Sequence, residues 1–265
     1  GPEFELTERR LLDPRKFKDP YVTAEGVERA VVALTHLRTL WFNTGSLCNI
    51  TCQNCYMDSS PVNDSLQYLS LSEVREYLDE IDATGLPVEE IAFTGGEPFM
   101  NRDLPGMIEE SLARGHRVLV LTNAMKPMLN KRPRLKEIQN RHGNALSIRV
   151  SVDHFTRPKH EDVRGRGSWA PMIEGLKWLA ENGFQPSAAG RTCWNETEDA
   201  AEASCMEVIT PQSCAKQYFT IDFSTPVVFC LKHFHLRVYQ LLLNVEFFLK
   251  PMCLKYGLVY SNSGQ

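Results

Sequence analysis

Short apolar runs alternate with helical stretches from residue 39 to about residue 193. Five of these runs are typical of strands in their β-branched and apolar content: residues 39–43, 90–94, 117–122, 147–152 and 186–193. The segments between them are long enough to hold a helix each, which is the pattern of repeated βα units around a parallel sheet. The sequence therefore predicts an α/β fold whose sheet is closed, or nearly closed, into a barrel.

Helix boundaries are marked by capping residues. The pair Ser70 and Glu73 forms a capping box, apolar residues follow it at helical spacing, and Gly85 ends the predicted helix. Asp103 and Ser168 are the predicted N-caps of two later helices, which end at Gly115 and Gly183. A preliminary helix is predicted over residues 24–34, and a fifth core helix over residues 196–208.

The composition divides the chain into three parts. Residues 1–38 are predicted to be an N-terminal extension, of which residues 1–4 are a cloning remnant, and residues 39–203 form the core. Residues 204–265 form a tail of a different kind, with three acidic against five basic residues and six of the 13 phenylalanines. Residues 224–230 within this tail are predicted to supply the sixth strand.

The formal net charge is −4, so no basic excess indicates a nucleic-acid or anionic-membrane binder. A small molecule or a peptide is the expected substrate, with no nucleic acid and no membrane as partners. No run reaches the roughly 18 apolar residues of a membrane span. Three of the eight cysteines lie within eight residues, a crowding that favours metal binding over disulfides and predicts a cytoplasmic or other reducing intracellular compartment.

Those three residues, Cys48, Cys52 and Cys55, follow the first predicted strand with the spacing C-x3-C-x2-C. Such a loop can place three thiolates around one compact metal centre and leaves one coordination position open, as catalytic metal sites do. Two alternatives remain open at this point. A structural zinc could be completed by a distant ligand such as Cys193, or the three thiols could be buried without a metal.

A second unusual segment follows the next strand and consists of Thr94, Gly95, Gly96, Glu97 and Pro98. The glycines allow a sharp turn and a close approach of backbone to a ligand, and the carboxylate offers acceptors for an ammonium group. The alternative is an ordinary tight turn between strand and helix.

Together these segments resemble the radical S-adenosylmethionine (radical SAM) superfamily. The cysteine triad is similar to the C-x3-C-x-Φ-C signature, although Asn54 stands where an aromatic residue usually precedes the third cysteine and the aromatic is Tyr56. The Gly-Gly-Glu-Pro turn matches a second family motif. Ser151-Val-Asp153, followed by a segment from His160 to Gly165 that reads His-Glu-Asp-Val-Arg-Gly, is similar to a third.

The resemblance implies a partial (β/α)6 TIM-like barrel. In it, Cys48, Cys52 and Cys55 bind a [4Fe-4S] cluster whose fourth iron is chelated by S-adenosylmethionine. One electron, from a reductant such as flavodoxin or ferredoxin, cleaves the cofactor, and the resulting 5′-deoxyadenosyl radical abstracts hydrogen from a substrate that the motifs do not name. The implied cofactor-binding residues are Thr94, Gly95, Gly96, Glu97, Pro98, Asn123, Ser151, Asp153 and Arg191.

Three side chains keep two interpretations each. Asp162 and Arg164 form either a salt bridge within a loop or part of the reaction site. Arg191 pairs either with the cofactor carboxylate or, as a structural partner, with Asp153 or Glu97. For the whole chain, the alternatives to a radical SAM enzyme are a non-catalytic iron–sulfur or zinc protein, and an inactive truncated or splice variant.

Overall fold

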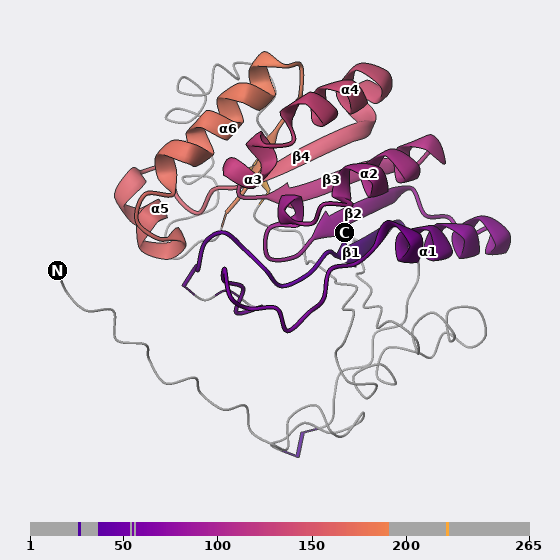
Figure 1. Ribbon diagram of the computed structural model, residues 1–265, viewed down its shortest axis with the longest axis horizontal. Coiled ribbons are helices and arrows are strands. Elements are labelled where there is room, and N and C mark those ends of the chain that lie inside the picture. Colours follow the sequence, from indigo (N-terminus) through magenta and orange to yellow (C-terminus); the bar gives the residue numbers. More distant parts are fainter. Residues whose placement is uncertain (1–25, 28–36, 54, 56, 191–220, 223–265) are drawn as a thin grey trace.

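A single parallel sheet organises the protein (Figure 1). The computed structural model describes residues 26–27, 37–53, 55, 57–190 and 221–222. The six strands lie in the sheet in the order in which they occur in the chain, and every neighbouring pair is parallel. They are β1 (Thr39–Asn43), β2 (Glu90–Thr94), β3 (Arg117–Thr122), β4 (Leu146–Ser151), β5 (Ser187–Ala189) and β6 (Ile221–Asp222).

Helices connect these strands and follow one another along one side of the sheet (Figure 1). They are α1 (Leu71–Thr84), α2 (Leu104–Ala113), α3 (Lys126–Leu129), α4 (Arg132–His142), α5 (Arg157–Arg164) and α6 (Trp169–Glu181), with short 3₁₀ helices η1 (Pro98–Met100) and η2 (Gly143–Ala145). Because strand order equals chain order, each crossover returns to the next position in the sheet, as in a (β/α) barrel.

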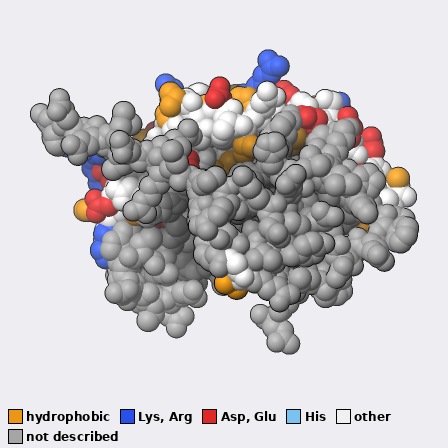
Figure 2. Space-filling view, turned by 90° about the horizontal axis from the view of Figure 1, so that it is seen from below, with side chains coloured by type: hydrophobic (Ala, Val, Ile, Leu, Met, Phe, Trp, Pro, Cys, Tyr) orange, Lys and Arg blue, Asp and Glu red, His pale blue; other side chains and the backbone are white. Residues whose placement is uncertain are grey.

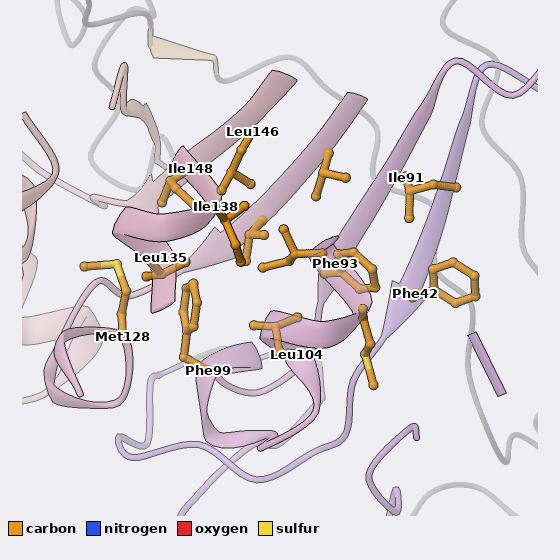
Figure 3. Packing of buried hydrophobic residues seen from close by; sticks show 14 of the residues in the cluster. Phe42, Ile91, Phe93, Phe99, Leu104, Met128, Leu135, Ile138, Leu146 and Ile148 are labelled. Carbon is orange, nitrogen blue, oxygen red and sulfur yellow. The ribbon is translucent and has the colours of Figure 1, made fainter. Parts of the chain in front are cut away.

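The main hydrophobic core lies between the sheet and this layer of helices (Figure 3). Phe42, Phe93 and Ile148 project from strands and pack with helix residues such as Leu104 and Leu135, all of them almost completely buried. Phe42 stacks on Phe93, with ring centroids 5.7 Å apart. Burying this apolar surface on both elements is what fixes the helices to the sheet.

The opposite face of the sheet is the inner face of the partial barrel. Trp41, Ala92 and Leu119 are in register on β1, β2 and β3 and form a second, small buried cluster there. On β4, burial alternates strictly, with Leu146, Ile148 and Val150 on the helix side. The alternate residues Ser147, Arg149 and Ser151 are therefore on the inner face, which confirms the predicted polar face of this strand.

The first four predicted strands are confirmed to within one residue, and the fifth is shorter than predicted. The capping box is confirmed, since the Ser70 hydroxyl accepts the Glu73 N–H, the Ser70 N–H donates to Glu73, and Gly85 is left-handed with φ 63°. The strand predicted at residues 224–230 lies outside the described residues and stays a prediction. Among the described residues, the strand that pairs with β5 is Ile221–Asp222.

Asp103 and Ser168 are confirmed as the N-cap residues of α2 and α6, but neither side chain makes a capping hydrogen bond. Both residues have helical rather than extended backbone angles, so their oxygens do not point at the next N–H groups. The Asp103 carboxylate lies instead 3.4 Å from the N–H of Leu71, at the start of α1. The helix predicted over residues 24–34 is also not supported at Gly26, a bend with φ 81°.

The remaining predicted boundaries fall outside the described residues. The residues that are not described include most of residues 1–38, the helix predicted over residues 196–208, and nearly all of residues 204–265. The division into extension, core and tail therefore stays a prediction. Within the part of the chain that the structure describes, no helix has the length and apolar character to cross a membrane. Figure 2 shows one face of the molecule, on which both acidic and basic side chains lie along the edge where the described residues are visible.

Candidate cofactor site

A cavity of about 330 Å³ lies at the carboxyl ends of the strands. In parallel α/β folds this end of the sheet carries the ligand sites, because the loops that follow the strands meet there. The cavity is lined by residues from all three motif segments and from the ends of β3 and β5: Cys48, Ile50, Cys52, Cys55, Ser59, Thr94, Gly95, Gly96, Leu121, Thr122, Asn123, Ser151, Asp153, Arg164, Ala189 and Gly190. The fold thus brings together residues that lie more than 100 positions apart in the sequence.

The cysteine loop follows β1 and is held at both ends. The N–H of Cys48 donates to the Ser60 carbonyl at 3.1 Å, and the N–H of Gln53 donates to the Val163 carbonyl in α5 at 2.8 Å. The second bond ties the loop to the element that carries Arg164. Backbone contacts, rather than side-chain packing alone, therefore set where the three cysteines lie.

The three cysteines differ in their surroundings. Cys48 is buried, whereas Cys52 and Cys55 are only partly buried, and none of them is in a disulfide. Burial raises the pKa of the Cys48 thiol to about 12, with the charge of Glu97 adding to this effect and a hydrogen bond from the Ile50 backbone opposing it. The Cys55 sulfur accepts the N–H of Ser59 at 3.4 Å.

The turn after β2 packs directly on the cysteine loop. The N–H of Gly96 donates to the Gly45 carbonyl at 2.9 Å, and the N–H of Glu97 donates to the Leu47 carbonyl at 3.0 Å. A Cβ atom on Gly96 would lie 2.6 Å from the Ser46 carbonyl oxygen and closer still to that of Leu47. Gly96 is therefore required for two backbone segments to lie side by side, as the sequence predicted for a close approach.

Glu97 is buried, and its carboxylate accepts three hydrogen bonds from within the protein. The donors are the Thr122 hydroxyl at 2.7 Å, the Asn123 N–H at 2.8 Å and the Phe99 N–H at 3.1 Å. This arrangement links the turn after β2 to the end of β3. The ammonium-binding role of Glu97 stays a prediction. Pro98 begins η1 and is buried away from the lining.

Burial also changes the acidity of Glu97. It raises the pKa of this carboxyl to about 7, and the hydrogen bonds from Asn123, Thr122 and Phe99, together with the charge of Arg164, oppose the shift. A carboxyl group with this pKa is partly protonated near neutral pH.

The sequence left the interactions of Asp162 and Arg164 open. Both residues lie in α5, a helix in a segment that the sequence predicted to be a loop. Arg164 Nε lies 2.7 Å from Oδ2 of Asp153, whose side chain is completely buried. Asp162 is exposed on the same helix, so the salt bridge expected between Asp162 and Arg164 is replaced by one between Arg164 and Asp153. Arg191, the expected partner of Asp153 or of the cofactor, lies outside the described residues, as does Cys193.

His160 is a buried residue of the site region to which the sequence assigned no role. It is 1% exposed, its ring meets that of Trp169 edge-on, and neither ring nitrogen has a hydrogen-bond partner. Burial lowers its pKa to about 4, and the charge of Arg164 acts in the same direction. His160 belongs to the same sequence motif as Arg164, but only the helical geometry of α5 shows that its ring is buried against Trp169.

A family model of the radical SAM superfamily matches residues 42–205, which is more than half of the chain. Together with the parallel sheet and the cysteine loop at its carboxyl end, this match defines the class. The chain belongs to the radical SAM superfamily.

Curated relatives agree with this assignment. A probable GTP 3′,8-cyclase of Metallosphaera sedula is 30% identical over 155 residues, which cover 58% of this chain and 43% of that protein. The antilisterial bacteriocin subtilosin biosynthesis protein AlbA of Bacillus subtilis is 28% identical over 138 residues, covering 52% of this chain and 29% of that protein. The chain thus spans less than half the length of either relative.

Solved structures support the fold. Streptococcus suis SuiB bound to S-adenosylmethionine matches with a TM-score of 0.56 and 13% identity, covering 74% of this chain and 42% of SuiB. Methylornithine synthase (PylB) matches with a TM-score of 0.50 and 12% identity, covering 72% of this chain and 55% of that protein. The predicted radical SAM type of partial barrel is confirmed at the level of the fold.

The donor set around the cavity is compatible with an iron–sulfur cluster. Three thiols line one cavity, which matches the preference of iron–sulfur clusters for thiolate ligands. Among the described residues, no group of three or more metal-ligating side chains is arranged to hold a single metal ion. A cluster of four irons is ligated at separate corners, so its cysteines surround a volume and need not converge on one point.

Proposed function

We propose that this protein is a radical SAM enzyme in which Cys48, Cys52 and Cys55 hold a [4Fe-4S] cluster and the neighbouring cavity holds S-adenosylmethionine. The observation that carries the proposal is that the three cysteines line the same cavity as Gly95, Gly96 and the polar end of β4. When bound, the cluster and S-adenosylmethionine supply the electron and the 5′-deoxyadenosyl radical that abstracts hydrogen from a small-molecule or peptide substrate.

The lining of the cavity combines apolar and polar side chains. Ile50, Leu121 and Ala189 are apolar and exclude water from the reacting atoms. Ser151, which pairs with Ala189 in the sheet, and the Arg164–Asp153 pair are polar. This mixed lining suits a ligand that has an apolar part and a charged end.

Arg164 is the positively charged residue among the described residues that line the cavity. Its Nε lies 2.7 Å from Oδ2 of Asp153, and a guanidinium has five N–H donors in all. Its remaining donors are available to the carboxylate of the methionine end of the cofactor. In this proposal Ser151 adds a hydroxyl, and the backbone of Gly95 and Gly96 lies against the ligand.

The experiment is anaerobic reconstitution with iron and sulfide, followed by addition of a reductant and S-adenosylmethionine. We expect about four irons per chain, an absorption and electron-paramagnetic-resonance (EPR) signature of [4Fe-4S], and release of 5′-deoxyadenosine measured by liquid chromatography. The reductant in the first assay is dithionite. Replacing it with flavodoxin or ferredoxin tests the expected physiological reductant. Tightly bound zinc, or a full cluster with no cofactor cleavage, would instead support the non-catalytic alternatives.

Cysteine variants identify the ligands. Cys48→Ala, Cys52→Ala and Cys55→Ala should each lose the cluster, whereas Cys253→Ala, in the C-terminal segment, serves as the matched control and should retain it. Intact cluster assembly in any of the three variants would reject that residue as a ligand.

A further inference from the structure

The sulfur of Cys48 accepts hydrogen bonds from protein groups that lie outside the ligand set. One comes from the backbone N–H of Ile50. The other comes from the side-chain amide of Asn123, whose Nδ2 lies 3.9 Å from the sulfur, within the range for a sulfur acceptor. Cys48 itself is buried, so this sulfur has little access to water and depends on protein donors.

The orientation of the Asn123 amide is determined by its other contacts. Its Oδ1 accepts the N–H of Met125 at 3.0 Å, and its Nδ2 donates to Oδ1 of Asn49 at 2.9 Å. A flipped amide would place its N–H donors against the Met125 N–H. The contacts therefore assign the nitrogen to the side that faces Cys48.

The backbone around Asn123 is held as firmly as its side chain. The Asn123 N–H donates to the buried carboxyl of Glu97 at 2.8 Å, and the next N–H, of Ala124, donates to the Thr122 hydroxyl at 3.0 Å. Ala124 is a buried non-glycine residue with a left-handed φ of 56°. A residue keeps this unfavourable conformation only where its surroundings determine it.

One of those surroundings is α6, which packs on the same turn. A Cβ atom on Gly175 would overlap the Ala124 carbonyl oxygen, so the helix backbone rests directly on the turn. The turn from Thr122 to Met125 is thus fixed from two sides, by Glu97 and by α6.

We propose that Asn123 is a positioning residue of the cluster site: its side-chain amide, carried on a turn that Glu97 and α6 fix, donates a hydrogen bond to the Cys48 sulfur and thereby raises the reduction potential of the cluster. This inference rests on the proposed function, because it requires a cluster on Cys48. A hydrogen bond to a cysteine ligand stabilises negative charge on the sulfur, and the reduced cluster carries one more negative charge than the oxidised one. The donor therefore favours reduction.

The test is a redox titration of the reconstituted cluster, followed by EPR in the absence of S-adenosylmethionine. In Asn123→Ala we expect the iron and sulfide content of the parent and a midpoint potential shifted to more negative values. Asn49→Ala is the matched control, because it removes the other partner of the amide but keeps the donor to Cys48. Its midpoint potential should equal that of the parent.

A second variant covers the loss of packing in Asn123→Ala. Asn123→Asp has nearly the same shape, but it replaces the donor with a carboxylate, and its potential should also be more negative. A midpoint potential equal to that of the parent in either variant would overturn the inference. Failure of both variants to assemble a cluster would also overturn it, because a residue that only donates a hydrogen bond is not needed as a ligand. Failure of the parent chain itself to assemble a [4Fe-4S] cluster would instead reject the proposed function.

Weaker binding of S-adenosylmethionine with an unchanged potential would also overturn the inference. That result would make Asn123 a contact of the cofactor, as the sequence predicts, rather than of the cluster ligand.

Discussion

Arg164 Nε, at the C-terminal end of α5, lies 2.7 Å from Oδ2 of Asp153, directly after β4. The pair joins a residue that follows a strand to the helix that carries the next motif, and it forms part of the cavity lining. The neighbouring residue Val163 accepts the N–H of Gln53 from the cysteine loop. The end of α5 is therefore the point at which the cysteine loop and the end of β4 are held together.

Removal of Arg164 should be costly because it takes a positive charge away from the buried carboxylate of Asp153. Arg164→Ala is expected to lower the free energy of unfolding by about 3–5 kcal/mol, the typical cost of breaking a buried ion pair from one side. Urea unfolding followed by circular dichroism measures this. Asp162→Ala, on the exposed face of the same helix, is the control and should change stability by less than about 0.5 kcal/mol. Equal stability of the two variants would contradict the role of the pair.

Gly96→Ala should destabilise the protein because its new methyl group meets backbone carbonyls of the cysteine loop, which cannot rotate away. Overpacking of this kind costs about 1–3 kcal/mol. The matched control is Gly106→Ala in α2, where the nearest atom is the flexible end of Leu71 at 3.1 Å. That change should be neutral, or stabilising by up to about 1 kcal/mol through helix propensity. In thermal unfolding of the two variants side by side, Gly96→Ala should lower the Tm and Gly106→Ala should not; equal Tm values would contradict the role of Gly96.

His160 should make the protein sensitive to acid. Its pKa is lowered from 6.5 to about 4 by burial and by Arg164, while Asp153 and Glu161 oppose the shift and His154 adds to it. The unfolded chain therefore binds a proton that the folded protein does not, so stability falls as pH decreases from 6.5 to 4. A shift of this size corresponds to about 3 kcal/mol.

The comparison that isolates this effect is His160→Phe, which keeps a ring against Trp169 and cannot titrate. The unfolding free energy of the parent relative to that of the variant should fall by up to about 3 kcal/mol between pH 7 and pH 4.5, because every other titrating group is common to both proteins and cancels in this difference. An identical pH dependence of the two proteins would exclude His160 as the cause.

Glu97 should act in the opposite direction over a similar range. Because burial raises its pKa from 4.5 to about 7, the folded protein retains a proton that the unfolded chain releases. Its contribution to stability therefore falls by up to about 3 kcal/mol as pH rises from 4.5 through 7. Glu97→Gln cannot lose that proton. The stability difference between parent and variant, measured by urea unfolding at pH 5 and pH 8, should change in favour of the variant at the higher pH.

The positions of the strands followed from the sequence because each is a short apolar run bounded by polar segments, which is a local signal. Helix α1 followed for the same reason, since Ser70, Glu73 and Gly85 are local start and stop signals. The N-cap positions Asp103 and Ser168 also followed from the sequence, but their capping hydrogen bonds did not form, because a side chain caps a helix when its backbone is extended and these two are helical. The strand Ile221–Asp222 was not predicted, because a strand of two residues has almost no periodicity of its own.

In the candidate site, too, some features followed from local sequence signals and others depended on the tertiary structure. The cysteine triad and the two glycines were identifiable from the sequence, because their chemistry and their need for close backbone contact are properties of the residues themselves. The pairing of Arg164 with Asp153 was not, since the sequence offered Asp162 as the partner of Arg164. The direction in which α5 leaves β4 places Arg164 next to Asp153 instead.

By itself, the sequence determined the class of this protein: βα units, three cysteines after the first strand and a glycine turn after the second define a radical SAM chain. The tertiary structure decided what each polar side chain does. It turned Glu97 inward to hold Thr122 and Asn123, and it directed the amide of Asn123 to the Cys48 sulfur. The reason is physical. Residue type fixes which interactions are possible, but a hydrogen bond or an ion pair forms only between groups that the packing of strands and helices brings within about 3 Å of each other.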